Sequence, residues 1–217
     1  MAGLRVGVLV SGRGSNLQAL IDACAASDFP AEIALVLSNR PDAFALERAA
    51  GAGLPTAVVD HRDFPGNKGA FEEAMDAALR GAGVELVCLA GFMRLLSPWF
   101  VERWYDRMIN IHPSLLPSFK GLDTHQRALD AGVRFHGCTV HYVRLEMDEG
   151  PIVAQAAVPV LPDDDAQRLA ARVLEAEHRI YPLALRLIAE GRAFVRDGRV
   201  EVTGTTPAPA TTINPAG

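Results

Sequence analysis

Residues 5–24, RVGVLVSGRGSNLQALIDAC, join a short β-branched apolar run, a glycine-bearing loop and an amphipathic segment. The apolar residues of the last part recur at helical spacing: Leu17, Leu20, Ile21 and Cys24. That spacing predicts a helix that follows a buried strand almost directly. A strand, a tight loop and a helix in this order form the repeating unit of an α/β fold.

Four further apolar runs of strand length follow along the chain, separated by longer helix-like stretches: 32–38, 55–60, 84–90 and 107–111. Continuous apolar strands that alternate with amphipathic helices are typical of a parallel sheet covered on both faces. The first half of the chain therefore predicts a doubly wound, mostly parallel, Rossmann-like α/β sheet.

The pattern changes from about residue 136. GCTVHYV (137–143) and GPIVAQAAVPV (150–160) are two apolar runs joined by the acidic RLEMDE. They predict a hairpin or a pair of longer edge strands. We expect a helix over roughly 163–190, with acidic residues near its N-terminal end and a glycine beyond its last turn.

A small hairpin is expected around Asp197-Gly198, which completes an antiparallel C-terminal extension. The last stretch, TGTTPAPATTINPAG, is rich in Thr, Pro and Ala and holds almost no core-forming residues. We therefore expect one domain over residues 1–203 and a disordered tail over 204–217.

The composition favours one soluble domain, because 217 residues with 49% hydrophobic and 22% charged residues can bury one sizeable core. A net charge of −5 argues against a nucleic-acid-binding surface. Cys24, Cys88 and Cys138 are far apart and lack a metal-binding spacing, so neither a disulfide framework nor a thiolate zinc site is expected. With no signal peptide and no membrane-spanning run, we expect a cytoplasmic protein without membrane partners.

Ser11-Gly12-Arg13-Gly14-Ser15-Asn16 lies between the first strand and the first helix. Glycines allow a tight turn there, and the start of the helix presents free N–H groups to an anion. Leu17 stands where a dinucleotide fingerprint needs its third glycine, and no Gly-Lys-Ser/Thr follows. The loop is therefore either a cradle for a phosphate monoester or a merely tight strand–helix turn.

Residues 106–121, DRMINIHPSLLPSFKG, carry the second feature of chemical interest. On a strand, Asn110 and His112 share one face, because side chains alternate with a period of two. An amide and an imidazole side by side can stabilise an oxyanion and move a proton, as attack on an acyl carbon requires. Alone, such a pair is more often a capping amide and a satisfied histidine.

The remaining candidates are weaker. Asp148 is either a solvated turn carboxylate or a partner that folds over the strand to reach His112. His136 and His141 face opposite sides of one strand and would chelate a metal poorly. His125 is better explained as a residue at a helix start than as a substrate contact.

Taken together, these motifs resemble those of the folate-dependent formyltransferases. The matching segments begin with VLVSGRGSNLQALIDAC and continue with LSNRPDAFALERA, LAGFMRLLSP, NIHPSLLPSFKGLDTHQRAL, HGCTVHYV and EMDEGPIVAQAAVPV. NIHPSLLP followed by a histidine-bearing strand and D-x-G-P is specific to the group as a whole. The SGRGSN loop narrows the resemblance to the branch that formylates glycinamide ribonucleotide.

The resemblance implies a role for each matching residue. Gly14, Ser15 and Asn16 would hold the substrate's ribose 5-phosphate, and Glu177 would contact the same substrate. The implied folate-binding residues are Met93, Arg94, Leu95 and Leu96, with Lys68 as the least secure, because its preceding loop departs from the family pattern.

The resemblance also assigns the catalytic roles. Asn110 would orient the formyl group and stabilise its oxyanion, and His112 would donate a proton. Asp148 would set the protonation of His112 and order a water for proton relay.

The implied reaction moves a formyl group from 10-formyltetrahydrofolate, a cosubstrate, to the amine of glycinamide ribonucleotide in purine synthesis, without a metal. The expected partners are these small molecules, and the chain would be a monomer or a homodimer. Formyltetrahydrofolate hydrolase is an alternative, as is a phosphate-sensing module without catalysis. A methionyl-tRNA formyltransferase would need a C-terminal nucleic-acid-binding domain that the tail does not supply.

Overall fold

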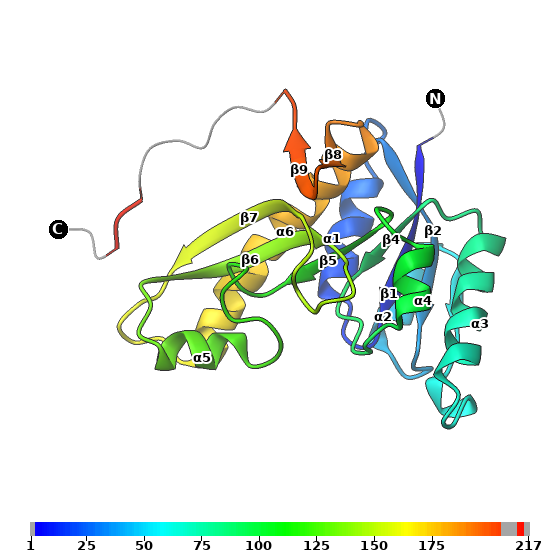
Figure 1. Ribbon diagram of the computed structural model, residues 1–217, viewed down its shortest axis with the longest axis horizontal. Coiled ribbons are helices and arrows are strands. Elements are labelled where there is room, and N and C mark those ends of the chain that lie inside the picture. Colours follow the sequence, from blue (N-terminus) through cyan, green and yellow to red (C-terminus); the bar gives the residue numbers. More distant parts are fainter. Residues whose placement is uncertain (1–2, 205–211, 215–217) are drawn as a thin grey trace.

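The computed structural model describes residues 3–204 and 212–214; the rest of the predicted tail lies outside the described residues. Its main sheet has the strand order β3-β2-β1-β4-β5-β6-β7 (Figure 1). The strands are β1 (Leu4–Val10), β2 (Ala31–Ser38), β3 (Thr56–Val58), β4 (Leu86–Leu89), β5 (Met108–His112), β6 (Phe135–Tyr142) and β7 (Ile152–Pro159).

The first five strands run parallel, and β6 and β7 are added antiparallel beside β5. The doubly wound, mostly parallel sheet with an antiparallel extension is therefore confirmed. The two strands expected after residue 136 are also confirmed: β6 and β7 pair antiparallel at the edge of the sheet, and β6 pairs with β5 on its other side.

Helices cover the two faces of the sheet unequally. They are α1 (Ser15–Cys24), α2 (Phe44–Gly51), α3 (Lys68–Gly81), α4 (Pro98–Arg103), α5 (Thr124–Asp130) and α6 (Ala166–Ala189), with a 3₁₀ turn η1 (His61–Asp63). On one face, Ile109 and Ile111 of β5 belong to the core that includes α1 and α6. On the other, Met108 belongs to the core built with α3 and α4.

Strand alternation then determines where Asn110 and His112 point. Both have the parity of Met108, so they lie on the α3/α4 face. On that face, the strand residues of the described core come from β1, β2 and β4, with Met108 alone from β5. The polar side chain of His112 is instead contacted by Asp148, from the turn that joins β6 to β7, and by the Phe119 backbone, from the loop after β5. This area holds the candidate site.

Helix α6 begins at Ala166 and not at 163, because Asp165 is its N-cap and accepts a hydrogen bond from the Arg168 backbone N–H. Asp164 lies before the helix and forms an ion pair with Arg172, whose Nη1 lies 2.7 Å from Asp164 Oδ2. The helix carries Glu177 toward the anion loop described below.

The C-terminal hairpin is confirmed as β8 (Ala193–Arg196) and β9 (Arg199–Val202), with positive φ angles of 49° at Asp197 and 74° at Gly198. Of the predicted tail, Asn214 is described, and its Nδ2 donates to the carbonyl oxygens of Arg134 and Val160. The three cysteines are free, as expected.

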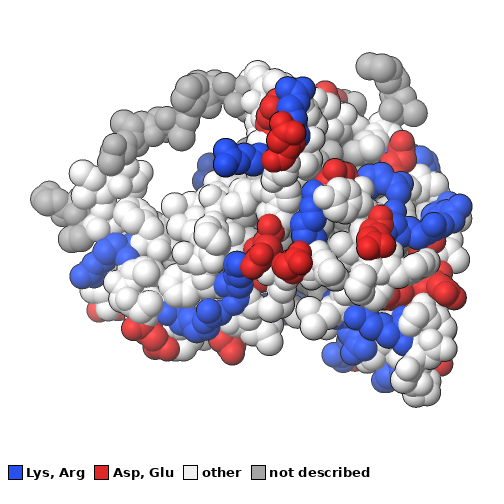
Figure 2. Space-filling view, viewed as in Figure 1, with Lys and Arg blue, Asp and Glu red and all other residues white. Residues whose placement is uncertain are grey.

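The surface in Figure 2 carries acidic and basic side chains side by side and shows no broad field of one sign. Among the described residues, no helix is both long enough and apolar enough to cross a bilayer.

Candidate active site

The register of the parallel strands brings two sequence motifs together. Leu9 of β1 pairs with Leu89 of β4, and Leu89 pairs with Asn110 of β5. The residues that follow, Ser11 after β1 and His112 at the end of β5, therefore emerge at the same edge of the sheet. With β4 between them, their strands lie about 10 Å apart, since neighbouring strands are spaced by about 4.8 Å. Ligand sites of open α/β sheets form at this edge.

Residues 11–16, which we call the anion loop, form one wall of a cavity of about 310 Å³. The other wall consists of Ala90, Gly91 and Met93 after β4. Gly14 is the N-cap of α1 and has a φ of 71°, a left-handed conformation that favours glycine. A Cβ at Gly14 would lie 2.6 Å from the Cβ of Ala45, so no larger residue fits.

The start of α1 leaves backbone N–H groups free toward this cavity. Asn16 and Glu177 meet beside it, and Asn16 Nδ2 donates to Glu177 Oε2 over 2.7 Å. The other amide atom, Asn16 Oδ1, is buried and has no hydrogen-bond partner among the described residues. A buried acceptor without a donor costs free energy, so this atom marks a position for a ligand donor.

Glu177 is buried, and burial raises the pKa of its carboxyl group, while the hydrogen bond from Asn16 partly opposes that rise. Glu177 therefore lies behind Asn16, which lines the cavity, and a desolvated carboxyl group there is suited to a cationic or hydrogen-bonding group of a ligand. The structure brings Glu177, which the resemblance implies as a substrate contact, next to Asn16 of the anion loop.

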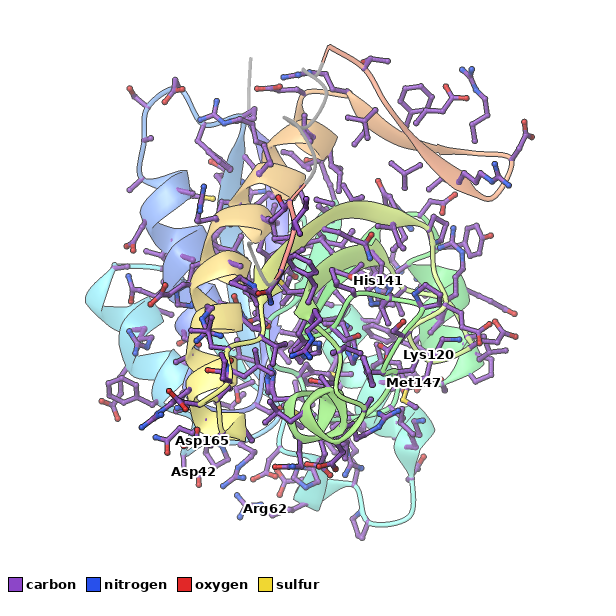
Figure 3. All side chains as sticks on the ribbon, turned by 90° about the vertical axis from the view of Figure 1, so that its left-hand side faces the viewer. Asp42, Arg62, Lys120, His141, Met147 and Asp165 are labelled. Carbon is purple, nitrogen blue, oxygen red and sulfur yellow. The ribbon has the colours of Figure 1, made fainter. Side chains whose placement is uncertain are left out.

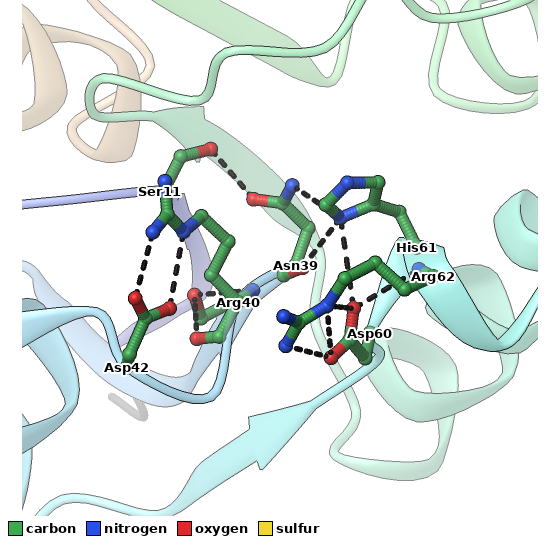
Figure 4. A network of polar contacts seen from close by, with 8 residues as sticks. Ser11, Asn39, Arg40, Asp42, Asp60, His61 and Arg62 are labelled. Carbon is green, nitrogen blue, oxygen red and sulfur yellow. Dashed lines mark hydrogen bonds and ion pairs between the residues drawn. The ribbon is translucent and has the colours of Figure 1, made fainter.

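The loop after β4 is tied to the anion loop by one hydroxyl group. Ser11 Oγ accepts a hydrogen bond from the Met93 backbone N–H (2.8 Å) and donates to Asn39 Oδ1 (2.6 Å). Figure 4 shows how this network continues to His61, whose Nδ1 lies 3.0 Å from the Asn39 carbonyl oxygen. The Ser11 hydroxyl group therefore links the two loops.

The predicted folate residues occupy that second loop. Met93 is 72% exposed and Leu95 is 73% exposed, and Arg94 is exposed too, whereas Leu96 packs against the α3/α4 core. Large apolar side chains exposed beside a polar cavity are typical of a surface that an aromatic ligand covers.

Lys68, the fifth implied folate residue, is the first residue of α3. Its Nζ lies 3.9 Å from the buried Glu72, which also accepts hydrogen bonds from the backbone N–H and hydroxyl group of Ser97. Since Ser97 follows Leu96 directly, Lys68 lies near the end of the loop after β4.

Asp148 reaches His112. Its Oδ2 lies 3.5 Å from His112 Nδ1, which is an ion-pair distance, and accepts a hydrogen bond from the Gly121 N–H at 2.9 Å. The other ring nitrogen, Nε2, lies 3.1 Å from the Phe119 carbonyl oxygen. Both nitrogens of His112 therefore face oxygen acceptors.

A fourth polar residue joins this group, and sequence reasoning missed it. His141 lies opposite Asn110 in the β5–β6 pair, and its Nε2 is 3.2 Å from Asn110 Nδ2 and 3.8 Å from Asp148 Oδ1. Figure 3 labels it where β6 meets the following turn. The one signal in the sequence was its place on the strand expected after residue 136; the pairing register was not visible. We call Asn110, His112, His141 and Asp148 the acid cluster.

The other two histidines of this part of the chain lie elsewhere. His136 packs its ring against those of Phe119 and His125, and His125 lies in the first turn of α5, as expected. Burial lowers the pKa of His136 to about 4 and also lowers that of His125. Among the described residues no group of three or more His, Cys, Asp or Glu side chains is arranged to hold a metal ion.

Comparison with known proteins identifies the scaffold. A family model described as formyl transferase matches residues 4–185. The chain belongs to the formyl transferase family. The phosphoribosylglycinamide formyltransferase of Haemophilus influenzae is 44% identical over 200 residues, which cover 92% of this chain and 94% of that relative.

Solved structures of formyl transferases agree with the fold. Glycinamide ribonucleotide transformylase 1 from Symbiobacterium toebii superposes with a TM-score of 0.89 at 48% identity and covers 92% of this chain and 94% of its own. A formyltetrahydrofolate deformylase from Pseudomonas syringae superposes with a TM-score of 0.85 at 27% identity, where the match covers 92% of this chain and 66% of the deformylase.

Some formyl transferase relatives are much longer. The trifunctional purine biosynthetic protein adenosine-3 of Drosophila pseudoobscura is 53% identical over 189 residues, and the chain spans 14% of its length. The similarity to that protein therefore concerns one segment of it.

Proposed function

We propose that the chain transfers a formyl group from 10-formyltetrahydrofolate to the amine of glycinamide ribonucleotide, a step of purine biosynthesis. One observation carries the proposal. The strand register brings the anion loop, after β1, and the acid cluster, on β5, to the same edge of the sheet with only β4 between them. A phosphorylated amine and an acyl donor then meet between the two groups, and this proximity supplies much of the rate enhancement.

The anion loop holds the phosphate of glycinamide ribonucleotide. Backbone N–H groups at the start of α1, with Ser15, bind the phosphate oxygens at the positive end of the helix dipole. Asn16 and Glu177 lie deeper and take the hydroxyl and amine groups, which provide the donor that the buried Asn16 Oδ1 lacks. The chemistry of these residues fits a sugar phosphate that carries an amine.

The loop after β4 holds the folate. The exposed apolar side chains of Met93 and Leu95 suit the face of an aromatic pterin, while backbone groups recognise its polar edge. Arg94 and Lys68 provide positive charge for the carboxylates of the folate tail. The folate supplies an activated formyl group, and its N10, the nitrogen that carries this group, becomes the leaving group.

The acid cluster acts on the formyl carbon. As the amine nitrogen forms its bond to that carbon, the C=O electron pair moves to oxygen, and the Asn110 amide donates a hydrogen bond to this oxyanion. His112 donates a proton to the folate nitrogen. The oxyanion electron pair then re-forms the C=O bond, and the old C–N bond breaks with its electron pair going to the folate nitrogen. The proton lost by the attacking amine passes to a water that Asp148 orders, and through that water it returns to His112.

One contact must change during this sequence. His112 Nε2 is engaged by the Phe119 carbonyl oxygen, and Nδ1 faces Asp148. The proton on Nε2 therefore reaches the folate nitrogen only when the contact with Phe119 is exchanged for one with substrate.

The hydrolase alternative uses the same acid cluster with water as the nucleophile. The anion loop favours the transferase, because hydrolysis needs no site for a sugar phosphate. We further propose that the chain acts on small molecules, in the cytoplasm, as a monomer or homodimer.

A folate absorbance assay with and without glycinamide ribonucleotide tests the proposal. We expect folate turnover that depends on the amine and yields formylglycinamide ribonucleotide. Turnover without the amine would instead identify a hydrolase, and no turnover in either case would point to a sensor.

A further inference from the structure

The acid cluster contains a histidine with no part in the steps above. His141 is 2% exposed, and its Nε2 faces the side chains of both Asn110, at 3.2 Å, and Asp148, at 3.8 Å. The β6–β7 pairing shifts register between Val140 and His141. Such irregularities re-aim side chains and are frequent beside active sites. The position of the His141 ring is thus determined by its place in the sheet.

The backbone determines which ring nitrogen of His141 carries a proton. Nδ1 lies 3.0 Å from the carbonyl oxygen of Tyr142, which can only accept a hydrogen bond. That carbonyl is itself confined, because Gly150 approaches so closely that a Cβ there would lie 1.6 Å from the oxygen. Nδ1 therefore holds the hydrogen, and Nε2 presents a lone pair to Asn110.

The surroundings of His141 keep the ring neutral. Burial is the main cause that lowers its pKa, and the nearby His112 lowers it further. The Tyr142 carbonyl and Asp148 oppose this, but the net direction is down. The ring therefore accepts through Nε2 at neutral pH.

The neutral His141 Nε2 determines the orientation of the Asn110 amide, because it accepts a hydrogen bond from the Nδ2 end. Nδ2 lies 3.2 Å from His141 Nε2, so one of its two N–H bonds is used there and the second is left for a ligand oxygen. Without His141, the amide can rotate by half a turn and present Oδ1, which repels an oxyanion.

We propose that His141 is a positioning residue that holds the Asn110 amide as a hydrogen-bond donor toward the formyl oxygen. The proposal rests on the proposed function for its kinetic consequence, but the arrangement itself exists before any substrate binds.

A double-mutant cycle tests the kinetic part. We expect His141→Ala to lower kcat about 10–100-fold, a part of the loss of about 10²–10³ that follows removal of an oxyanion donor. The KM for glycinamide ribonucleotide should change little, because the anion loop is untouched. In an Asn110→Ala background, the same change should alter kcat by less than about twofold, the usual limit for independent effects.

Matched variants separate positioning from general damage. His141→Gln places an amide oxygen near the position of Nε2 and should recover most of the lost kcat. A fall in kcat that is equally large with and without Asn110 would overturn the proposal. So would a coupling of His141 to Asp148→Asn with none to Asn110, because that would assign the ring to the carboxylate.

A substrate-free measurement distinguishes failure of this proposal from failure of the proposed function. Nitrogen NMR of the folded protein reports the His141 tautomer, and the Asn110 side-chain amide protons report the bond to it. We expect a neutral ring protonated at Nδ1 and an Asn110 amide signal that moves in His141→Gln and His141→Ala. A ring protonated at Nε2 at neutral pH would overturn the proposal even if formyl transfer is observed.

Discussion

The anion loop is made by one contiguous segment, whereas the acid cluster collects its four side chains from β5, β6 and the turn before β7. In the loop, the proposed binding groups are backbone N–H groups beside a glycine with a positive φ, so the local sequence specifies the site. In the cluster, each member depends on contacts between strands or across a turn. The anion loop should therefore tolerate substitutions in distant parts of the chain, whereas the acid cluster should not.

The largest effect is expected in the acid cluster. Asn110→Ala and His112→Ala should each lower kcat by about 10²–10³ or more, because a stabilising donor or the proton donor is lost. The melting temperature should stay close to that of the parent chain. Steady-state kinetics and thermal melts test both points, and near-normal turnover in either variant would contradict the proposed mechanism.

The anion loop should lose affinity for substrate when its backbone conformation is disturbed. Gly14→Ala places a side chain in a left-handed conformation that costs about 1–2 kcal/mol and brings its Cβ against Ala45. We expect a rise of about tenfold or more in the KM for glycinamide ribonucleotide, which corresponds to about 1.4 kcal/mol of binding.

Gly12→Ala is the matched control for that change, because a Cβ at Gly12 meets nothing within 4 Å. It should leave stability nearly unchanged and raise the KM much less than Gly14→Ala does. Equal effects from the two substitutions would show that the loop does not act through the conformation of Gly14.

Glu177 contacts the anion loop from α6, a distant part of the chain. Its negative charge should destabilise the protein when no substrate is bound. Its pKa is raised in the folded state, so the stability linked to its protonation is fully present in acid and is lost as pH rises through that raised pKa. Glu177→Gln removes the buried charge and should raise the melting temperature at neutral pH by about 2–4 °C for each kcal/mol relieved.

The advantage of Glu177→Gln should vanish at pH values below the ordinary carboxyl pKa, where the parent side chain is neutral too. Calorimetric melts across pH measure this, with the KM for glycinamide ribonucleotide expected to rise in the same variant. A melting difference that is independent of pH would contradict burial as the cause.

The smallest effect concerns an ion pair at the rim of the acid cluster. Lys120 Nζ lies 2.6 Å from Glu149 Oε1, next to the Phe119 and Gly121 backbone groups that contact His112 and Asp148. The pair is 34% and 52% exposed, so its worth is at most about 1 kcal/mol and is screened by salt.

Lys120→Ala should therefore lower kcat by less than about fivefold, which is the kinetic equivalent of that energy. Exchanging the two charges, with Lys120→Glu and Glu149→Lys together, should recover the loss. A larger effect that the exchange does not recover would show that Lys120 acts in another way.

Much of the fold was predictable, because its determinants are local. The alternation of apolar strands and amphipathic helices, the Asp197-Gly198 turn and the shared face of Asn110 and His112 all follow from periods of two and 3.6 residues. The expected start of α6 was three residues too early. The start is determined by the hydrogen bond that the Asp165 side chain accepts from the Arg168 backbone N–H.

The sequence by itself determined the α/β order, the glycine loop and the amide–imidazole pair, since neighbouring residues and backbone geometry suffice for each. Only the tertiary structure decided that Asp148 reaches His112, that Glu177 meets Asn16 across 161 positions of the chain, and that His141 faces Asn110. Those contacts depend on strand register, a register shift in the sheet and the path of a turn. Side-chain periodicity carries none of this information, because it records which face a residue occupies and not which residue lies opposite.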